Sequence, residues 1–264
     1  MIADVARLPR LLRLIAPVAW RGRAAIARKL MGFSHTEHGS ALDMFRAAEL
    51  AQEPRLRRLF YRHGLDEARH ARRFSEVAKA VGGPEASAGR YGRMHAVRQD
   101  LYERLGEVRF VAFVWLSESR AKAQFEALSE HFAAVSTRGR GEARDLGDTL
   151  HRLFEEIGQD EHFHASYAKS LLDAWRDEGR GDEVARAIRS VRLEEAWMGW
   201  RRAGRRIGDL LVKLTFTALF LTALPPFAIA QRLFDRRTVG WQTLPAPPAP
   251  TTEEDQLAAL RRPY

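Results

Sequence analysis

A five-residue pattern, Asp-Glu-x-x-His, occurs twice in this chain of 264 residues, at residues 66–70 (DEARH) and 160–164 (DEHFH). Both copies lie in long stretches rich in Ala, Leu, Arg and Glu, a composition that favours helix. On a helix, a Glu and a His three positions apart lie on the same face, so each pair can bind one metal ion. One Glu-x-x-His is expected by chance in a chain of this composition, but two copies that each follow an Asp are not. The repeat therefore predicts helices that bring two metal-binding pairs together.

The composition narrows the kind of metal site. The chain has no cysteine, which excludes disulfide scaffolds, thiolate zinc sites and iron–sulfur clusters. Any metal ion must therefore be bound by carboxylates and imidazoles.

Glycine and proline occur in few clusters, and no segment shows the alternation typical of a strand. The long stretches between these clusters predict an all-α chain. We expect helices over residues 3–31, 34–53, 54–81, 96–135, 142–178 and 182–206.

A pair of metal ions in a helical bundle takes one further Glu from each of two partner helices. Neighbouring antiparallel helices bring two residues level when both lie equally far from the connecting turn. Measured from Pro54, Glu37 matches Glu67 better than Glu49 does. Measured from residues 136–141, Glu118 matches Glu161 better than Glu126 does, with Glu126 as the alternative.

The resulting order of carboxylates and imidazoles resembles the ferritin-like di-iron carboxylate superfamily over residues 34–178. Residues 66–70 resemble the motif of its bacterial multicomponent monooxygenases, and residues 118–125 (ESRAKAQF) are similar to the Glu-Ala-Arg segment of the ferritin-like tRNA hydroxylase. A membrane-attached di-iron bundle also resembles demethoxyubiquinone hydroxylase. The resemblance implies a ferritin-like four-helix bundle with additional N- and C-terminal helices. It also implies two Fe ions, or an Fe/Mn pair, held by six residues that are both the metal ligands and the catalytic residues: Glu37, Glu67, His70, Glu118, Glu161 and His164.

The resemblance also gives roles to residues around this set. Asp66 and Asp160 would each accept a hydrogen bond from a ligand histidine, the one in the opposite motif, and so fix its tautomer; the alternative is that both are solvated surface acids. One departure concerns Lys122, because some hydroxylases of the superfamily carry a hydroxyl residue at this position, one turn after the third-helix Glu.

Four other histidines lie near the proposed ligands. His63 precedes Glu67 by one turn on the same side of its helix, where an additional ligand, a proton carrier or a partly exposed histidine would all fit. His35 and His38 flank Glu37 and are expected at the surface or the mouth of a pocket. His162 is expected to point away from the metal ions.

Basic segments flank the near-neutral centre of the chain. Residues 1–33 are expected to form a basic amphipathic helix, and residues 179–237 a basic helix followed by an apolar anchor, with a flexible tail at 238–264. No residue from Leu214 to Ala230 is charged, so this part either contacts a membrane or is a buried core helix. Pro225 and Pro226 are expected to kink or break it. Trp197 and Trp200, just before it, suit a membrane interface or internal packing.

These features predict a membrane-associated di-iron oxidoreductase that activates O₂ to hydroxylate, desaturate or otherwise oxidise an apolar, lipid- or quinone-like substrate. The apolar run 110–116 before Glu118 would line its pocket with Val111, Val114 and Trp115, unless that run is core packing. The expected partners are membrane lipid, the apolar substrate, O₂ and an electron donor, with a homodimer left open, and the expected location is the cytoplasmic face of a bacterial inner membrane. The alternatives are a tRNA-modifying di-iron hydroxylase that uses the basic flanks to bind nucleic acid, and a ferritin- or rubrerythrin-like iron-handling protein.

Overall fold

The computed structural model describes residues 12–83 and 99–234, and in these ranges every regular element is a helix and no strand occurs. The expected tail at 238–264 and the first residues of the N-terminal helix lie outside the described residues. The elements are α2 (Arg23–Leu50), α3 (Pro54–Gly82), α5 (Leu101–Leu105), α6 (Glu107–Arg138), α7 (Glu142–Trp175) and α8 (Gly181–Phe234). Residues Arg176–Arg180 form a kink between α7 and α8, in which Gly179 has a φ of 88°. The all-α prediction is confirmed.

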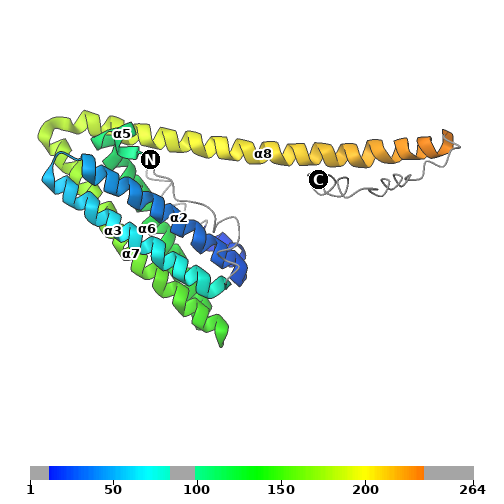
Figure 1. Cartoon of the computed structure of the whole chain (residues 1–264), viewed down its shortest axis with the longest axis horizontal. Coiled ribbons are helices and arrows are strands. Elements are labelled where there is room, and N and C mark those ends of the chain that lie inside the picture. Colours follow the sequence, from blue (N-terminus) through cyan, green and yellow to red (C-terminus); the bar gives the residue numbers. More distant parts are fainter. Residues whose placement is uncertain (1–11, 84–98, 235–264) are drawn as a thin grey trace, which may run out of the picture. The chain divides into compact units, whose positions relative to one another are not determined.

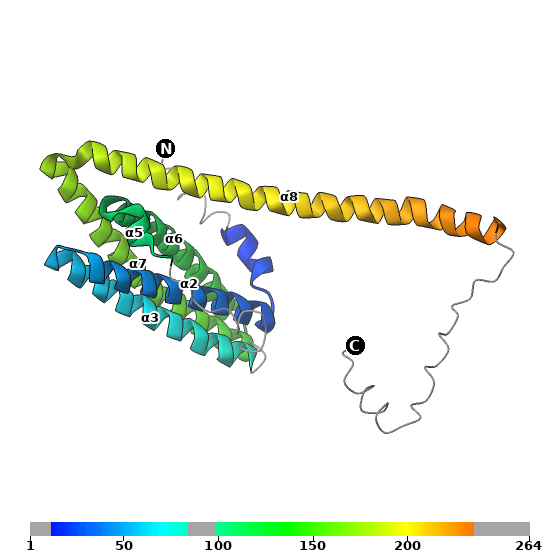
Figure 2. The same cartoon turned by 45° about the horizontal axis from the view of Figure 1, so that its top comes forward.

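Four long helices, α2, α3, α6 and α7, lie side by side (Figures 1 and 2). α2 packs along α3 and α6 packs along α7, and α3 also contacts α7. Only residues 51–53 separate α2 from α3, and only residues 139–141 separate α6 from α7. Such short connections make each pair antiparallel.

Two apolar clusters hold these helices together. The first core cluster includes Met44, Phe60, Phe110 and Leu172, and the first turns of α8 add Val184 to it. The second core cluster includes Leu30, Phe74, Phe132 and Phe154. On each of the four helices, the buried Glu and His residues lie between the segments that belong to the two clusters. The bundle therefore has a buried polar layer between two apolar ones.

The N-terminal helix boundary differs from the prediction. Residues 12–19 are helical, the break falls at residues 20–22, and α2 then continues past the boundary expected near residues 31–34. Leu30, Met31 and Ser34 are all buried on one face of α2, and the Ser34 hydroxyl donates a hydrogen bond to the Ala71 carbonyl of α3 at 2.7 Å. The packed face continues across this region, so the helix does as well.

The long third helix expected over 96–135 is divided in the structure. A five-residue helix, α5, ends at Leu105, Gly106 follows it, and α6 begins at Glu107. Gly106 has φ 73°, a left-handed conformation that costs a residue with a Cβ atom about 1 kcal/mol or more. The chain therefore changes direction at Gly106.

The chain divides into two compact units, residues 1–198 and 199–264. The described part of the second unit is a helix that continues through Pro225 and Pro226. The expected break at these prolines is therefore wrong: the φ that a proline ring imposes is compatible with a helix, although each proline removes one backbone hydrogen bond.

The second unit is exposed along its apolar stretch. Phe216, Phe220 and Phe227 are 62–69% exposed, and the most apolar 18-residue window has a mean hydropathy of 1.7 with none of it buried. Among the described residues, one helix is thus long and apolar enough to cross a membrane by length and composition. Membrane contact by this stretch stays a prediction, as does its alternative, a buried core helix.

Candidate metal centre

The structure brings together the six residues that were expected to bind metal. Each of the four long helices contributes at least one of them, and all are buried: Glu37, Glu67, His70, Glu118, Glu161 and His164. The competing Glu49 and Glu126 are exposed and pair with Arg46 and Lys122 respectively. The role of the six as metal ligands stays a prediction, but their placement is what the turn-distance argument requires.

The ligand atoms form two overlapping groups. Within each group they lie no more than 4.8 Å from one another, which is close enough to surround one ion. One group is Glu37, Glu67, His70 and Glu161; the other is His63, Glu67, Glu118 and His164. Glu67 belongs to both groups, so two ions held there would share it as a ligand.

The two halves of the bundle exchange hydrogen bonds just outside this centre. His70 Nε2 lies 3.0 Å from Asp160 Oδ2, and His164 Nε2 lies 3.4 Å from Asp66 Oδ2. Each Asp therefore pairs with the histidine of the opposite motif, as predicted. In a neutral ring whose Nε2 donates its proton to Asp, Nδ1 keeps its lone pair for a metal ion.

Arg69 connects the two aspartates. Its Nη2 lies 3.0 Å from Asp66 Oδ1 and 2.7 Å from Asp160 Oδ2. The hydrogen bonds from the histidines, together with the Arg69 charge, lower the pKa of both carboxyls. Both aspartates are thus ionised at neutral pH and accept hydrogen bonds from the imidazoles.

Four buried polar atoms in the centre have no hydrogen-bond partner among the described residues. They are Nδ1 of His70, Nδ1 of His164 and both carboxylate oxygens of Glu161. The nitrogens lie 3.3 and 3.5 Å from these oxygens, but without hydrogen-bond geometry. Buried polar atoms normally have a partner because their desolvation is costly. Four such atoms in one buried layer fit bound cations, and the donor types suit iron or manganese.

The ionisation of the carboxyls is also typical of a cation site. Burial and the repulsion of neighbouring carboxylates raise the pKa of Glu37, Glu67 and Glu118 well above its ordinary range. Burial acts in the same direction on Glu161, but contacts with the His164 and His70 imidazoles outweigh it and lower its pKa. Without a metal ion, the cluster keeps protons that bound cations would replace.

The imidazoles differ in their charge. Burial lowers the pKa of His70, but the hydrogen bond with Asp160 and the contact with Glu161 outweigh burial and raise it to about 9. Opposing effects of the same kind raise the pKa of His164. Burial and the neighbouring His164 lower the pKa of His63 well below its usual range. His63 is therefore neutral at neutral pH, whereas His70 carries an extra proton that a metal ion would displace.

His63 is the residue whose environment the sequence did not settle. It is 1% exposed, so the partly exposed alternative is wrong, and it lies in the same layer as the six predicted ligands. In the sequence, only its position one turn before Glu67 indicated that His63 belongs to this layer. The other histidines near the proposed ligands lie where they were expected, with His35 half-buried and His38 and His162 exposed.

The apolar run before Glu118 is part of the core. Val111 and Val114 are 0% and 1% exposed and belong to the first core cluster, against which Trp115 packs. The run is therefore core packing, which was the alternative to the lining of a substrate pocket.

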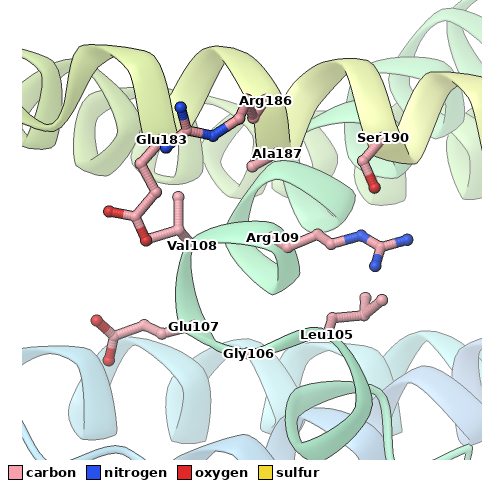
Figure 3. Close-up of a pocket in the computed structure, with 9 residues that line it drawn as sticks. All are labelled: Leu105, Gly106, Glu107, Val108, Arg109, Glu183, Arg186, Ala187 and Ser190. Carbon is pink, nitrogen blue, oxygen red and sulfur yellow. The ribbon is translucent and has the colours of Figure 1, made fainter.

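Two hollows in the surface are lined by both charged and apolar side chains. One, of about 290 Å³, lies between the start of α6 and the first turns of α8, where Glu107, Arg109, Glu183 and Arg186 alternate in charge (Figure 3). Another, of about 520 Å³, lies along α6 and α7 and includes Lys122 and His162, neighbours of the metal centre in sequence. None of the six predicted ligands lines either hollow.

Comparisons with protein-family models, curated proteins and solved structures find no match to this chain.

Proposed function

We propose that this chain is a membrane-associated di-iron oxidoreductase with a ferritin-like bundle, which uses O₂ to oxidise an apolar substrate. The observation that carries the proposal is the buried layer in which six metal-binding side chains converge and four of their atoms have no hydrogen-bond partner among the described residues. A structural bundle would fill this layer with apolar side chains, because unpaired buried polar atoms lower the stability of the fold.

Different residues of the chain have different roles at the proposed metal centre. Glu37, Glu67, His70, Glu118, Glu161 and His164 would hold two Fe ions, or an Fe/Mn pair. Asp66 and Asp160 hold the two imidazoles in one tautomer with Nδ1 facing the carboxylates. The two apolar clusters on either side exclude water from the layer.

When bound, the metal pair would supply the binding and reduction of O₂. For a hydroxylation, one oxygen atom enters a C–H bond of the substrate and the other leaves as water, with the electrons supplied by an external donor and the protons by solvent. Carboxylate ligands suit this chemistry because they can bridge two ions and change between one- and two-oxygen binding as the charge of the ions changes.

The apolar character of the substrate follows from the second unit. An exposed helix with the composition of a membrane span would place the enzyme on a bilayer, where lipids and isoprenoid quinones are the abundant substrates. Exposed apolar surface of this extent is typical of a membrane or protein contact. The cytoplasmic face of a bacterial membrane is part of this proposal.

The test is O₂ consumption by the full-length protein loaded with Fe(II), in liposomes made from a total lipid and quinone extract and with a chemical reductant. We expect O₂ uptake with formation of a hydroxylated or desaturated product detected by mass spectrometry. His70→Ala should abolish both. His151→Ala is the matched control, because His151 is a half-buried histidine of α7 that pairs with Ser129 outside the centre.

Other outcomes assign a different function. Oxidation of Fe(II) without a lipid product would indicate iron handling, and salt-sensitive binding and modification of tRNA would indicate the RNA hydroxylase. Absence of O₂ uptake in protein shown to contain iron would contradict the oxidoreductase.

A further inference from the structure

His63 lies against the metal centre although it is outside both Glu-x-x-His pairs. Its imidazole stacks on that of His164, with the ring centroids 3.7 Å apart and the planes 21° from parallel. Its Nε2 atom lies 3.0 Å from Glu67 Oε1 and 3.8 Å from Glu118 Oε1. His63 therefore directs one ring nitrogen toward two of the proposed ligands.

The other ring nitrogen of His63 is held from outside the centre. Its Nδ1 atom lies 2.6 Å from the hydroxyl oxygen of Tyr167, one turn after His164 on α7. Tyr167 is itself 9% exposed.

All three imidazoles of the layer share this arrangement. Each has one nitrogen facing the carboxylates and the other paired with an oxygen on the neighbouring helix: Asp160 for His70, Asp66 for His164 and Tyr167 for His63. Histidines that bind metal ions characteristically have this second partner, which fixes the tautomer and the orientation of the ring. His63 differs from the other two in two ways. It faces the centre with Nε2 instead of Nδ1, and this Nε2 pairs with Glu67 Oε1, whereas Nδ1 of His70 and of His164 has no hydrogen-bond partner among the described residues.

We propose that His63 is a seventh metal ligand, positioned by Tyr167, and that the two metal positions are therefore unequal. This inference rests on the proposed metal centre. The nitrogen-rich position would consist of His63, Glu67, Glu118 and His164, and the oxygen-rich position of Glu37, Glu67, His70 and Glu161. With Nε2 bound to metal, His63 carries its proton on Nδ1 and donates it to the Tyr167 oxygen.

Unequal donors give unequal metal preferences. Imidazole nitrogen favours Fe(II), Co(II) and Zn(II), whereas carboxylate oxygen is better suited to Mn(II). The nitrogen-rich position should therefore discriminate more strongly against Mn(II) than the oxygen-rich position does. Such a centre would accept two different metals in a defined arrangement.

The first test counts Co(II) ions bound to the full-length protein by anaerobic titration, elemental analysis and visible absorption. The wild type should bind about two ions per chain. His63→Ala should lose the ion at the nitrogen-rich position or bind it about 100-fold or more weakly, with a changed Co(II) spectrum. The His151→Ala control should match the wild type.

Two further variants separate ligation from packing. In His63→Gly, added free imidazole should restore the second ion and the spectrum, because it can occupy the space of the missing ring. Tyr167→Phe should keep both ions but bind the second about 10–100-fold more weakly, because it removes only the partner of Nδ1.

A third test uses only the wild-type protein, so its outcome does not depend on whether a variant folds. In the Co(II)-loaded protein, each bound imidazole has one exchangeable N–H whose proton NMR signal is strongly shifted by the paramagnetic ion. Three such signals support His63 as a ligand. Two signals, together with unchanged binding and spectra in His63→Ala, would overturn the inference while leaving a six-ligand centre intact. A wild type that binds no Co(II), Fe(II) or Mn(II) would instead contradict the proposed function itself.

Discussion

His70 of α3 and Asp160 of α7 are joined by a hydrogen bond of 3.0 Å across the bundle, although 90 residues separate them in the chain. The mirrored pair, His164 and Asp66, makes the equivalent contact in the opposite direction. Each half of the bundle therefore orients an imidazole of the other half. In both copies of Asp-Glu-x-x-His, the Asp pairs with the opposite helix while the Glu and the His lie in the buried layer.

Asp160→Asn should weaken metal binding without unfolding the bundle. The amide is isosteric but neutral, so it no longer stabilises the His70 tautomer that exposes Nδ1, and metal affinity should fall about 10–100-fold. Titration with Mn(II) or Co(II) measures the effect. Asp173→Asn is the matched control, because Asp173 lies on the same helix and pairs with Lys169 and Arg176. Equal affinities in the two variants would show that Asp160 is only a surface acid.

The metal-free protein should lose stability between pH 6.5 and about 9. The folded state raises the pKa of His70 from 6.5 to about 9, so the stability from its bound proton is complete below pH 6.5 and is lost as the pH approaches the folded value. The loss from His70 alone would be up to about 3 kcal/mol. The raised pKa values of Glu37, Glu67 and Glu118 act in the same direction, because the unfolded chain releases these protons at lower pH.

Denaturant unfolding of chelator-treated protein at these two pH values checks this effect. The lowered pKa of His63 has the opposite sign, but its contribution is lost only below pH 6.5. Metal affinity should rise over the same pH interval, since the ions compete with protons. Stability that increases toward pH 9 in the metal-free protein would contradict the assigned ionisation states.

Gly147→Ala should destabilise the bundle by about 1–3 kcal/mol. A Cβ atom at Gly147 would lie 2.6 Å from the backbone nitrogen and 2.8 Å from the Cα atom of Ser136, where α6 and α7 approach each other. Backbone atoms at this distance cannot move aside as a flexible side chain can. The change should be visible as a lower denaturation midpoint.

The matched control for this variant is Gly158→Ala, also in α7. A Cβ atom there would meet only Phe125 Cβ, at an ordinary contact distance of 3.6 Å. Because alanine favours a helix over glycine by up to about 1 kcal/mol, this variant should be neutral or slightly stabilised. If both glycines respond alike, close approach of the two helices is not the reason for Gly147.

Charges placed in the apolar helix should release the protein from membranes. Phe220 and Leu221 are 62% and 64% exposed, and a basic side chain at the centre of a bilayer costs about 2.5–3.5 kcal/mol. Phe220→Arg combined with Leu221→Arg should therefore abolish flotation with neutral liposomes in high salt. Leu193→Arg, at a position 70% exposed in the first unit, should leave flotation unchanged. Wild-type protein that stays in the supernatant would contradict the membrane attachment.

The four helices that carry the proposed metal ligands could be predicted because the sequence patterns that indicate them are local. The spacing of Glu67 and His70 places both on one face, and the distance to a turn selects Glu37 over Glu49 and Glu118 over Glu126. Both relationships hold wherever helices are regular and the connections between them are short. Both conditions hold in α2, α3, α6 and α7.

The missed features depend on tertiary packing or on one backbone conformation. The burial of His63 depends on His164 and Tyr167, which lie about a hundred positions further along the chain. The start of α6 depends on the left-handed conformation of Gly106, which the surrounding composition does not reveal. The last helix continues through Pro225 and Pro226, where the low helix propensity of proline predicts that a helix ends.

The most direct test of the proposed centre is the metal content of the full-length protein, measured by elemental analysis after production in medium that contains iron and manganese. The account predicts about two ions of Fe, or Fe and Mn, per chain, and a loss of at least one ion in His70→Ala or His164→Ala. His151→Ala should match the wild type. A correctly folded wild-type chain that holds neither Fe nor Mn, even after reconstitution, would contradict the account.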